Sequence, residues 1–366
     1  MIPTLRTARF LRAYLRDGAG PFREEEITVP IGGEAREATL YLPTRRGPAP
    51  GWVVLHGLTV PGRHHKAMTR FVRSLAASGA AVLVPDVPAW RELRLDVGAA
   101  RTTLADASHW LAQRPEVRPG GVATVGFSFG ATQALMAMAD PAVQRDVRAV
   151  VGFGGYCDLQ RMLRCLFTGE HEWQGQRHHL DPDPYGRWII VGNYLTLIQE
   201  YEGMEAVARG ALELAVEAGR VGAWAWEPVY DATKARVRAG LSPAERALWD
   251  VIAPPSGSPP ADPALALKLS DAFCAAALDK DPGLDPRPHL SRVRGRVVLS
   301  HGRADRLIPF TETLRLRELL PPAARPSVTI TGLFAHSAHA GWLHPVDRVR
   351  EAGLFIRLLN DALSAV

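Results

Sequence analysis

The sequence contains no apolar stretch long enough to cross a membrane. A membrane-spanning helix needs about 20 consecutive, mostly apolar residues, and no stretch here approaches that length. The amino-terminal segment MIPTLRTARFLRAYLRDG is basic and lacks the uninterrupted apolar core of a secretion signal. We therefore expect no membrane span and no signal peptide, and we expect a cytoplasmic protein.

Cysteine is rare. Its three occurrences, Cys157, Cys165 and Cys274, are an odd number and show no C-x-x-C spacing. This argues against a disulfide scaffold and against a structural zinc site, and it suits a reducing compartment. Because Cys157 and Cys165 lie in or near apolar segments, we expect buried, unreactive thiols.

Lysine is scarce as well, with only four among 43 basic residues, and the formal net charge is a modest +5. The arginines are scattered along the chain and are mostly interspersed with acidic residues. A nucleic-acid-binding domain concentrates its positive charge on one face. We therefore expect no nucleic-acid partner.

The basic amino terminus predicts an amphipathic helix within residues 1–24. Leu5, Ala8, Leu11 and Leu15 are expected towards one side of it. The simplest interpretation is a helix packed on its own domain. Contact with a membrane surface is the alternative.

The sequence does contain a series of short, valine-rich apolar runs bounded by glycine or proline. Each run has four to six apolar residues, as expected for strands buried on both faces. Helix-like segments lie between the runs, so we expect a mostly parallel sheet with crossover helices on both faces, an α/β fold. EEITVPI and EATLYLP alternate more and predict an antiparallel pair at the sheet edge. The buried runs are GWVVLHG (51–57), GAAVLVPDVP (79–88), GVATVGFSFG (121–130), VRAVVGFGG (147–155), GRVVLSHG (295–302) and PSVTITGLFAH (326–336).

Three parts are predicted along the chain. The amino-terminal helix occupies residues 1–24, and an α/β core comprises residues 25–155 and 290–366. A mainly helical insertion, residues 156–289, precedes the last two strands and contains no buried run of the same kind. Its helical patterns are DLQRMLRCLF, MEAVARGALELAVEAG, PAERALWDVI and PALALKLSDAFCAAAL.

Ser128 lies in GFSFG, between the predicted strand VATVG and the predicted helix FGATQALMAM. A strand that ends in G-x-S-x-G and turns directly into a helix is a nucleophile elbow. The serine is held there at a strained backbone angle, and side chains at Gly126 or Gly130 would clash. The turn also leaves the N–H group of Phe129 at a helix amino terminus, where an oxyanion would be stabilised.

With this motif, the sequence resembles the α/β-hydrolase superfamily, in particular its esterases and dienelactone hydrolases, over roughly residues 25–155 and 290–362. The resemblance implies a cap at the position of the insertion. It also implies the chain order nucleophile, acid, histidine. VVLSHGRADRLIPF contains the H-G-x-x-D-x-x-[IV]-P pattern common in the family, which implies that Asp305 is the acid.

The histidine is expected after the last strand, where VTITGLFAHSAHAGW offers His336 and His339. His336 comes first after the strand and its turn, as is usual in the family, and is preferred. His339 would take its place if the loop were longer. For the acid, Asp158 is the alternative to Asp305, because some members place the acid after the strand VRAVVGFGG. Asp158 also suits the N-cap of the first helix of the insertion.

The stretch VVLHGLTVPG resembles the oxyanion loop of the family. The resemblance implies that the N–H group of Leu58 is an oxyanion donor beside that of Phe129. His56 is expected to fix this loop by hydrogen bonds. The H-G-G-G form of the loop, found in one large group of esterases and lipases, is missing.

The implied function is a serine hydrolase acting on small-molecule carboxylic esters. Neutral His336 would remove the proton of Ser128 as Oγ attacks the acyl carbonyl, and Asp305 would orient the imidazole. No metal or organic cofactor is needed. A peptidase or thioesterase with the same triad, or a non-catalytic scaffold that binds a small ligand, are the alternatives. The oligomeric state is not predicted.

Two features of the insertion are expected to be structural. The segment HEWQGQRHHLD (171–181) gathers histidines and acids but matches no common zinc spacing, so we expect a polar loop. Trp173, Trp188, Trp224 and Trp226 are expected to pack in the core of the insertion, with an acyl pocket as the alternative.

Overall fold

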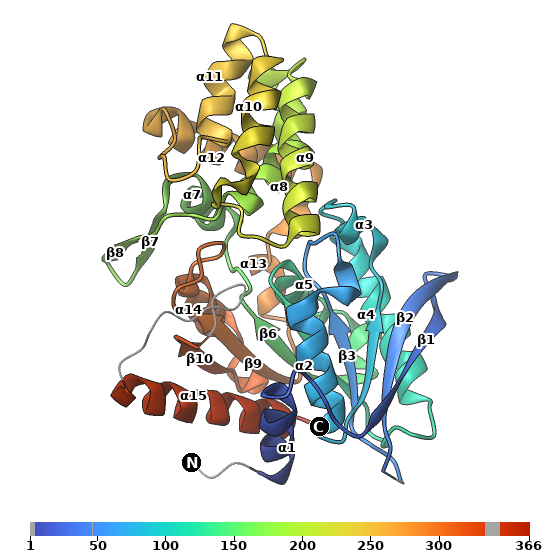
Figure 1. Ribbon diagram of the computed structural model, residues 1–366. Coiled ribbons are helices and arrows are strands. Elements are labelled where there is room, and N and C mark those ends of the chain that lie inside the picture. The colour runs from blue at the N-terminus through green and yellow to red at the C-terminus, as the bar shows by residue number, and fades with distance from the viewer. Residues whose placement is uncertain (1–3, 46, 334–344) are drawn as a thin grey trace.

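The computed structural model describes residues 4–45, 47–333 and 345–366 (Figure 1). At its centre is an eight-stranded sheet in the order β1-β2-β4-β3-β5-β6-β9-β10. β2 runs antiparallel to both of its neighbours, and the remaining pairs are parallel. The strands are β1 (Phe22–Ile31), β2 (Glu34–Pro43), β3 (Gly51–Leu55), β4 (Ala81–Pro85), β5 (Val122–Phe127), β6 (Val147–Phe153), β9 (Arg296–Gly302) and β10 (Ser327–Thr331).

This sheet confirms the predicted α/β class, a strand at each of the six runs and the antiparallel pair at one edge. The last run was expected to be buried on both faces, which was wrong: it forms the edge strand β10, in which only Thr329 and Thr331 are buried. The central runs are mainly apolar because both of their faces are covered. In β3, Trp52 and Val54 belong to the hydrophobic core on one face, whereas Val53 and Leu55 belong to the core on the other. Successive side chains of a strand point to opposite faces, so a strand buried on both sides needs a continuous apolar run.

Helices cover both faces of the sheet. Residues of α1, α2 and α15 pack in the core on one face, and residues of α4 and α5 pack in the core on the other (Figure 1). The helices outside the insertion are α1 (Leu5–Tyr14), α2 (Lys66–Ala77), α3 (Pro88–Arg91), α4 (Gly98–Ala112), α5 (Phe129–Ala137), α6 (Pro141–Gln144), α14 (Phe310–Leu319) and α15 (Pro345–Leu363).

The amino-terminal helix α1 packs on its own domain, but through a different face from the one expected. Its buried face is centred on Phe10, whose ring centroid lies 5.2 Å from that of Phe71. Leu5 and Leu15, the first and last leucines of the predicted apolar side, are 68% and 79% exposed. The prediction of that side was wrong because the aromatic ring, with its larger apolar area, sets the packing.

Between β6 and β9 the chain forms a group of helices that lies beyond one end of the sheet (Figure 1). The four helical patterns seen in this part of the sequence are confirmed. Three of its helices begin where Asp183, Ser242 or Asp262 caps the helix and a proline follows, which is the preferred start signal. The helices are α7 (Leu159–Thr168), α8 (Pro184–Tyr194), α9 (Glu205–Val221), α10 (Asp231–Ala239), α11 (Pro243–Ile252), α12 (Pro263–Lys280) and α13 (Arg287–Leu290).

The segment 171–181 forms most of a hairpin, so the expectation of a polar loop was wrong. β7 (Glu170–Trp173) pairs antiparallel with β8 (Gln176–His179). The two residues between them, Gln174 and Gly175, have φ values of 49° and 79°. A two-residue turn of type I′ requires positive φ at both positions, and Gln-Gly is a weaker signal for it than Asn-Gly or Asp-Gly.

The three cysteines are free and buried, which confirms the expectation for Cys157 and Cys165. Burial raises the pKa of the Cys157 and Cys165 thiols, and it raises that of Cys274 to about 11. Because the thiolate is the reactive form, these thiols are unreactive at neutral pH. None of the helices in the described ranges is both long and apolar enough to span a membrane.

Candidate active site

Ser128 occupies the turn between β5 and α5. Its backbone has φ 55° and ψ −125°, a strained conformation for a residue with a side chain. Its N–H group donates to the carbonyl oxygen of Phe153 at the end of β6, 2.7 Å away. α5 begins directly at Phe129, whose N–H group belongs to the first turn of the helix and has no intrahelical partner.

Three glycines make room for this turn. A Cβ atom at Gly126 would lie 2.3 Å from the carbonyl oxygen of Gly130, and a Cβ at Gly130 would lie 2.3 Å from that of His56. A Cβ at Gly57 would lie 3.3 Å from the Cβ of Ser128. The strand, the helix and the loop after β3 therefore meet at backbone contact, which brings the loop beside the serine.

His56 holds the loop after β3. Its Nδ1 lies 2.7 Å from the carbonyl oxygen of Gly57, and its Nε2 accepts from the N–H group of Val87 at 3.2 Å. Burial lowers the pKa of His56 to about 4, so the ring is neutral and Nδ1 is the donor. The Gly57 carbonyl and the Leu58 N–H group belong to one planar peptide, so fixing the carbonyl also fixes the N–H direction. The prediction that His56 fixes this loop is confirmed.

The insertion contacts the same loop. The hydroxyl of Tyr185 on α8 donates to the carbonyl oxygen of Leu58 at 3.0 Å. Burial raises the pKa of Tyr185, so its hydroxyl stays protonated and remains a donor. The carbonyl of Gly57 is thus hydrogen-bonded by a side chain of the core, and the carbonyl of Leu58 is hydrogen-bonded by a side chain of the insertion.

Ser128 lines an apolar pocket between the core and the insertion. The pocket has about 530 Å³ of empty space, including space open to solvent. Leu58 and Phe129 line it on the core side, and α7 and α8 line it on the other. The tryptophans of the insertion are absent from its described lining, and Trp188 is fully buried elsewhere. Ligand pockets are typically apolar with a few placed polar groups, and this pocket has that composition.

Asp305 lies in the loop after β9 and is buried. Its Oδ1 accepts from the N–H groups of Leu307 and Ile308, at 2.8 and 3.0 Å. Its Oδ2 lies 3.3 Å from Nε2 of His301, which also lies 2.8 Å from the carbonyl oxygen of Ile308. Leu307 and Ile308 line the pocket into which Ser128 opens. The structure therefore places the Asp305 loop and Ser128 at one cavity.

His336 and His339 lie outside the described residues. The strand before them, β10, ends at Thr331, and the buried carboxylate of Glu351 on α15 holds this strand end. Its Oε2 accepts from the hydroxyl of Thr331 at 2.7 Å and from the N–H group of Gly332 at 2.8 Å. Glu351 therefore fixes the point from which the segment with both histidines departs.

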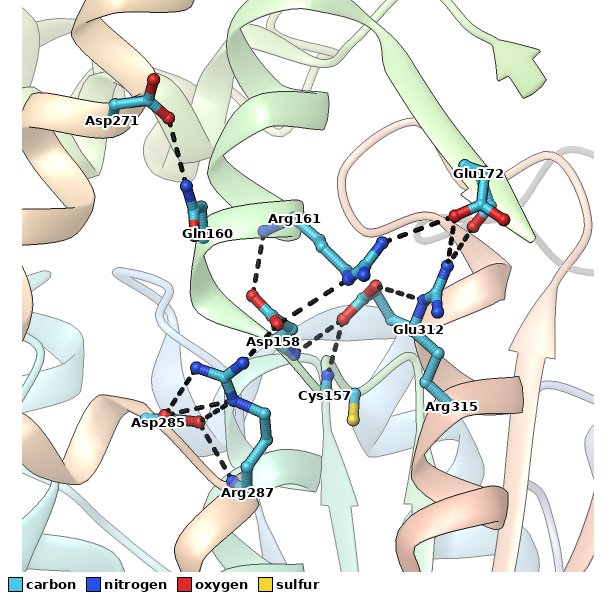
Figure 2. A network of polar contacts seen from close by, with 10 residues as sticks. All are labelled: Cys157, Asp158, Gln160, Arg161, Glu172, Asp271, Asp285, Arg287, Glu312 and Arg315. Atoms are coloured by element: carbon cyan, nitrogen blue, oxygen red, sulfur yellow. Dashed lines mark hydrogen bonds and ion pairs between the residues drawn. The ribbon is translucent and has the colours of Figure 1, made fainter. Parts of the chain in front are cut away.

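Asp158, the alternative acid, caps a helix and forms an ion pair (Figure 2). It is the N-cap of α7, and its Oδ1 accepts from the N–H group of Arg161 at 3.1 Å. Its Oδ2 lies 2.8 Å from Nη1 of Arg287. The prediction that Asp158 starts the first helix of the insertion is confirmed.

Glu312 is a buried carboxylate that sequence reasoning missed. Its Oε2 accepts from the N–H groups of Cys157 and Asp158, at 2.9 and 2.8 Å, and Nε of Arg315 lies 3.8 Å from its Oε1 (Figure 2). Burial raises the pKa of Glu312 to about 7. The charge of Asp158 also raises this pKa, whereas the two N–H groups lower it in part. Glu312 and Glu351 have the same structural role. Each lies on a helix and accepts hydrogen bonds from the chain at or just after the end of a strand. A single glutamate in a helix pattern carries no signal of such a contact.

Glu312→Gln is expected to change the pH dependence of stability. The folded pKa of about 7 lies above the ordinary value of 4.5, so the folded state holds more protons than the unfolded state between these pH values. The wild-type protein should therefore lose about 3 kcal/mol of stability relative to the variant as pH rises through this window. Denaturant unfolding of both proteins at several pH values measures this difference. Glu318→Gln, at an exposed position of the same helix, should leave the profile unchanged, and a parallel profile for Glu312→Gln would contradict the argument.

Comparison with known proteins gives partial matches. No family model matches the chain. Two proteins from Mycobacterium tuberculosis strains, both named "Putative phosphoribosyl transferase", are 33% identical to it over 145 residues, which is 38% of this chain and 31% of theirs. The chain thus matches about a third of the length of these relatives.

An esterase and a peptidase are among the solved structures that resemble this chain. The match to the esterase, from Pyrobaculum calidifontis, has a TM-score of 0.49 and 17% sequence identity, and it covers 99% of this chain and 94% of the esterase chain. A puromycin-hydrolyzing peptidase from Mycobacterium tuberculosis has a TM-score of 0.47 and 17% identity, over 95% of this chain and 38% of its own.

The geometry of the chain itself identifies its architecture. The sheet is parallel apart from its second strand, and the strand at its centre ends in a serine of strained backbone conformation that leads directly into a helix. This combination, with a half-buried serine at the end of the sheet, has the backbone geometry of the strand–turn–helix elbow in the α/β-hydrolases. The chain therefore has the α/β-hydrolase fold.

Proposed function

We propose that the protein is a serine hydrolase that cleaves carboxylic esters of small molecules through an acyl-enzyme on Ser128. The observation that carries this proposal is the strained Ser128 turn at an apolar pocket that Leu58 and Phe129 also line. A strained backbone conformation persists only where the surroundings hold it, and it is concentrated at functional sites. Here the surroundings are three glycines at backbone contact.

In this mechanism, Oγ of Ser128 attacks the acyl carbonyl and its proton passes to His336, with His339 as the alternative base. Asp305 orients the imidazole and stabilises its charged form. The N–H groups of Leu58 and Phe129 donate to the oxyanion, and the loss of one such donor costs about 10²–10³ in rate. The protonated histidine then gives its proton to the leaving alcohol, and water releases the acyl group by the reverse path.

We further propose that residues 156–289 act as a cap that selects the substrate. α7 and α8 provide one wall of the pocket, and their side chains there are mainly apolar. Such a wall favours an apolar acyl or alcohol group over a charged one, because burial of a charge without a partner is costly. The contact from Tyr185 to Leu58 links this wall to the proposed oxyanion donor.

Labelling with a fluorophosphonate tests the nucleophile without knowledge of the substrate. An activated serine attacks phosphorus and displaces fluoride, which leaves a stable phosphonyl adduct. We expect one adduct per chain, on the peptide that contains Ser128, and none on that peptide in Ser128→Ala. Peptide mass spectrometry locates the adduct. Folded wild-type protein without an adduct on Ser128 would contradict the proposal and favour the non-catalytic scaffold.

A further inference from the structure

A hollow lined by arginines lies away from the candidate active site. Its walls come from α1 and the turn after it, the end of β2 and the end of α2, and it has about 1260 Å³ of empty space, including space open to solvent. Because β2 runs antiparallel to β4, the end of β2 lies beside the start of β4. Ser128 follows the opposite, carboxyl end of the parallel strands. The hollow and the candidate active site are therefore at opposite ends of the sheet.

Four arginines line this hollow. Arg9 and Arg12 lie on α1, Arg16 lies in the turn that ends it, and Arg45 follows β2. The spacing of three and four residues places the first three along one side of the helix. All four are exposed, and within the described ranges none of their guanidinium groups has a hydrogen bond or ion pair. The described lining contains no aspartate or glutamate, so four positive charges share a concave surface without a counter-charge.

Arg6 adds to the positive charge on this side of the molecule. One of its nitrogens, Nη1, donates to the carbonyl oxygen of Leu363 at 2.6 Å. Its Nε and Nη2 are buried and have no hydrogen-bond partner in the described part of the chain. Burial, followed by the charges of Arg118 and Arg45, lowers the pKa of Arg6 to about 10. Arg45, which lines the hollow, is thus among the charges that act on Arg6.

We propose that the hollow binds a ligand through negatively charged phosphate. A guanidinium presents planar, paired donors that match the oxygens of a phosphate. A concave surface of one charge sign also raises the local concentration of the opposite ion. Leu5 and Leu15 are exposed at the two ends of α1, so a lipid headgroup is a source of the phosphate alongside a free phosphate ester.

Calorimetric titration of the full chain with inorganic pyrophosphate tests the site. We expect saturable binding that weakens as salt is added, because the arginines are exposed. The double substitution Arg12→Gln/Arg16→Gln should weaken binding by about tenfold or more. Arg317→Gln is the matched control, since Arg317 is also exposed and is without a described partner on α14. Co-sedimentation with phosphatidylcholine vesicles, with and without phosphatidylglycerol, tests the lipid source.

A free phosphate ligand is supported if the double variant loses pyrophosphate binding and the Arg317→Gln control keeps it. Binding only to vesicles with phosphatidylglycerol, lost in the double variant alone, supports the site with a lipid headgroup as its ligand. No binding of either kind, or an equal loss in Arg317→Gln, overturns the proposal. Fluorophosphonate labelling of Ser128 should be unchanged in the double variant, so this test stands apart from the proposed hydrolase activity.

Discussion

Replacement of Ser128 by alanine should reduce ester hydrolysis by a factor of about 10⁴–10⁶. The pocket has two other described hydroxyl groups, and neither can take over as nucleophile. The hydroxyl of Tyr156 donates to the carbonyl oxygen of Leu284 at 2.8 Å, and that of Tyr185 donates to Leu58. Burial raises the pKa of both tyrosines, so both stay protonated. Turnover of a panel of activated esters measures the effect.

This substitution should leave the fold intact. Alanine at φ 55° carries the same kind of backbone strain as serine, and no described hydrogen bond of the Ser128 side chain is lost. The midpoint of denaturant unfolding should therefore stay close to that of the wild type. Full ester turnover by folded Ser128→Ala would show that the proposed mechanism is wrong.

Gly126→Ala should destabilise the protein by about 3 kcal/mol or more and remove fluorophosphonate labelling. The added Cβ would lie 2.3 Å from the oxygen and 2.6 Å from the carbon of the Gly130 carbonyl, and 2.7 Å from Cα of Ala131. All three are backbone atoms, so no side chain can turn aside to relieve the clash. The first turn of α5 would have to shift, and the serine with it. Denaturant unfolding and labelling kinetics measure the two effects.

Gly353→Ala is the matched control for the same chemical change. Gly353 lies within α15, and a Cβ there would meet nothing within 4 Å. Because alanine favours helix more than glycine does, this variant should be more stable by up to about 1 kcal/mol. Equal unfolding midpoints for Gly126→Ala and wild type would disprove the account of the turn.

The sheet could be predicted because its signal is local. In β3 and β4, burial on both faces demands an unbroken apolar run, and the sequence shows that run directly. The hairpin of β7 and β8 could not be predicted in this way, since both strands are polar and the turn carries only Gln-Gly. The buried side of α1 was missed because Phe71, the partner of Phe10, lies 61 residues away in the chain.

At the candidate site, too, the features that could be predicted are those that a local motif marks. The G-x-S-x-G pattern located the Ser128 turn because its glycines contact backbone within the same few residues. Glu312, Glu351 and Tyr185 act on loops 20 to 155 residues away, and no spacing rule connects such pairs. The base, His336 or His339, stays a prediction.

The ion pair between Asp158 and Arg287 bears on how the insertion is attached to the core. The chain passes into the insertion at Asp158 and returns from it at Arg287, and these two crossings are joined at 2.8 Å, with Asp285 2.8 Å from the same guanidinium (Figure 2). A contact between the two ends of an inserted segment closes that segment into a loop, and bringing loop ends together costs conformational entropy. The attraction between Asp158 and Arg287 offsets part of that cost. The insertion is thereby fastened at its own two ends as well as through the contact of Tyr185 with Leu58.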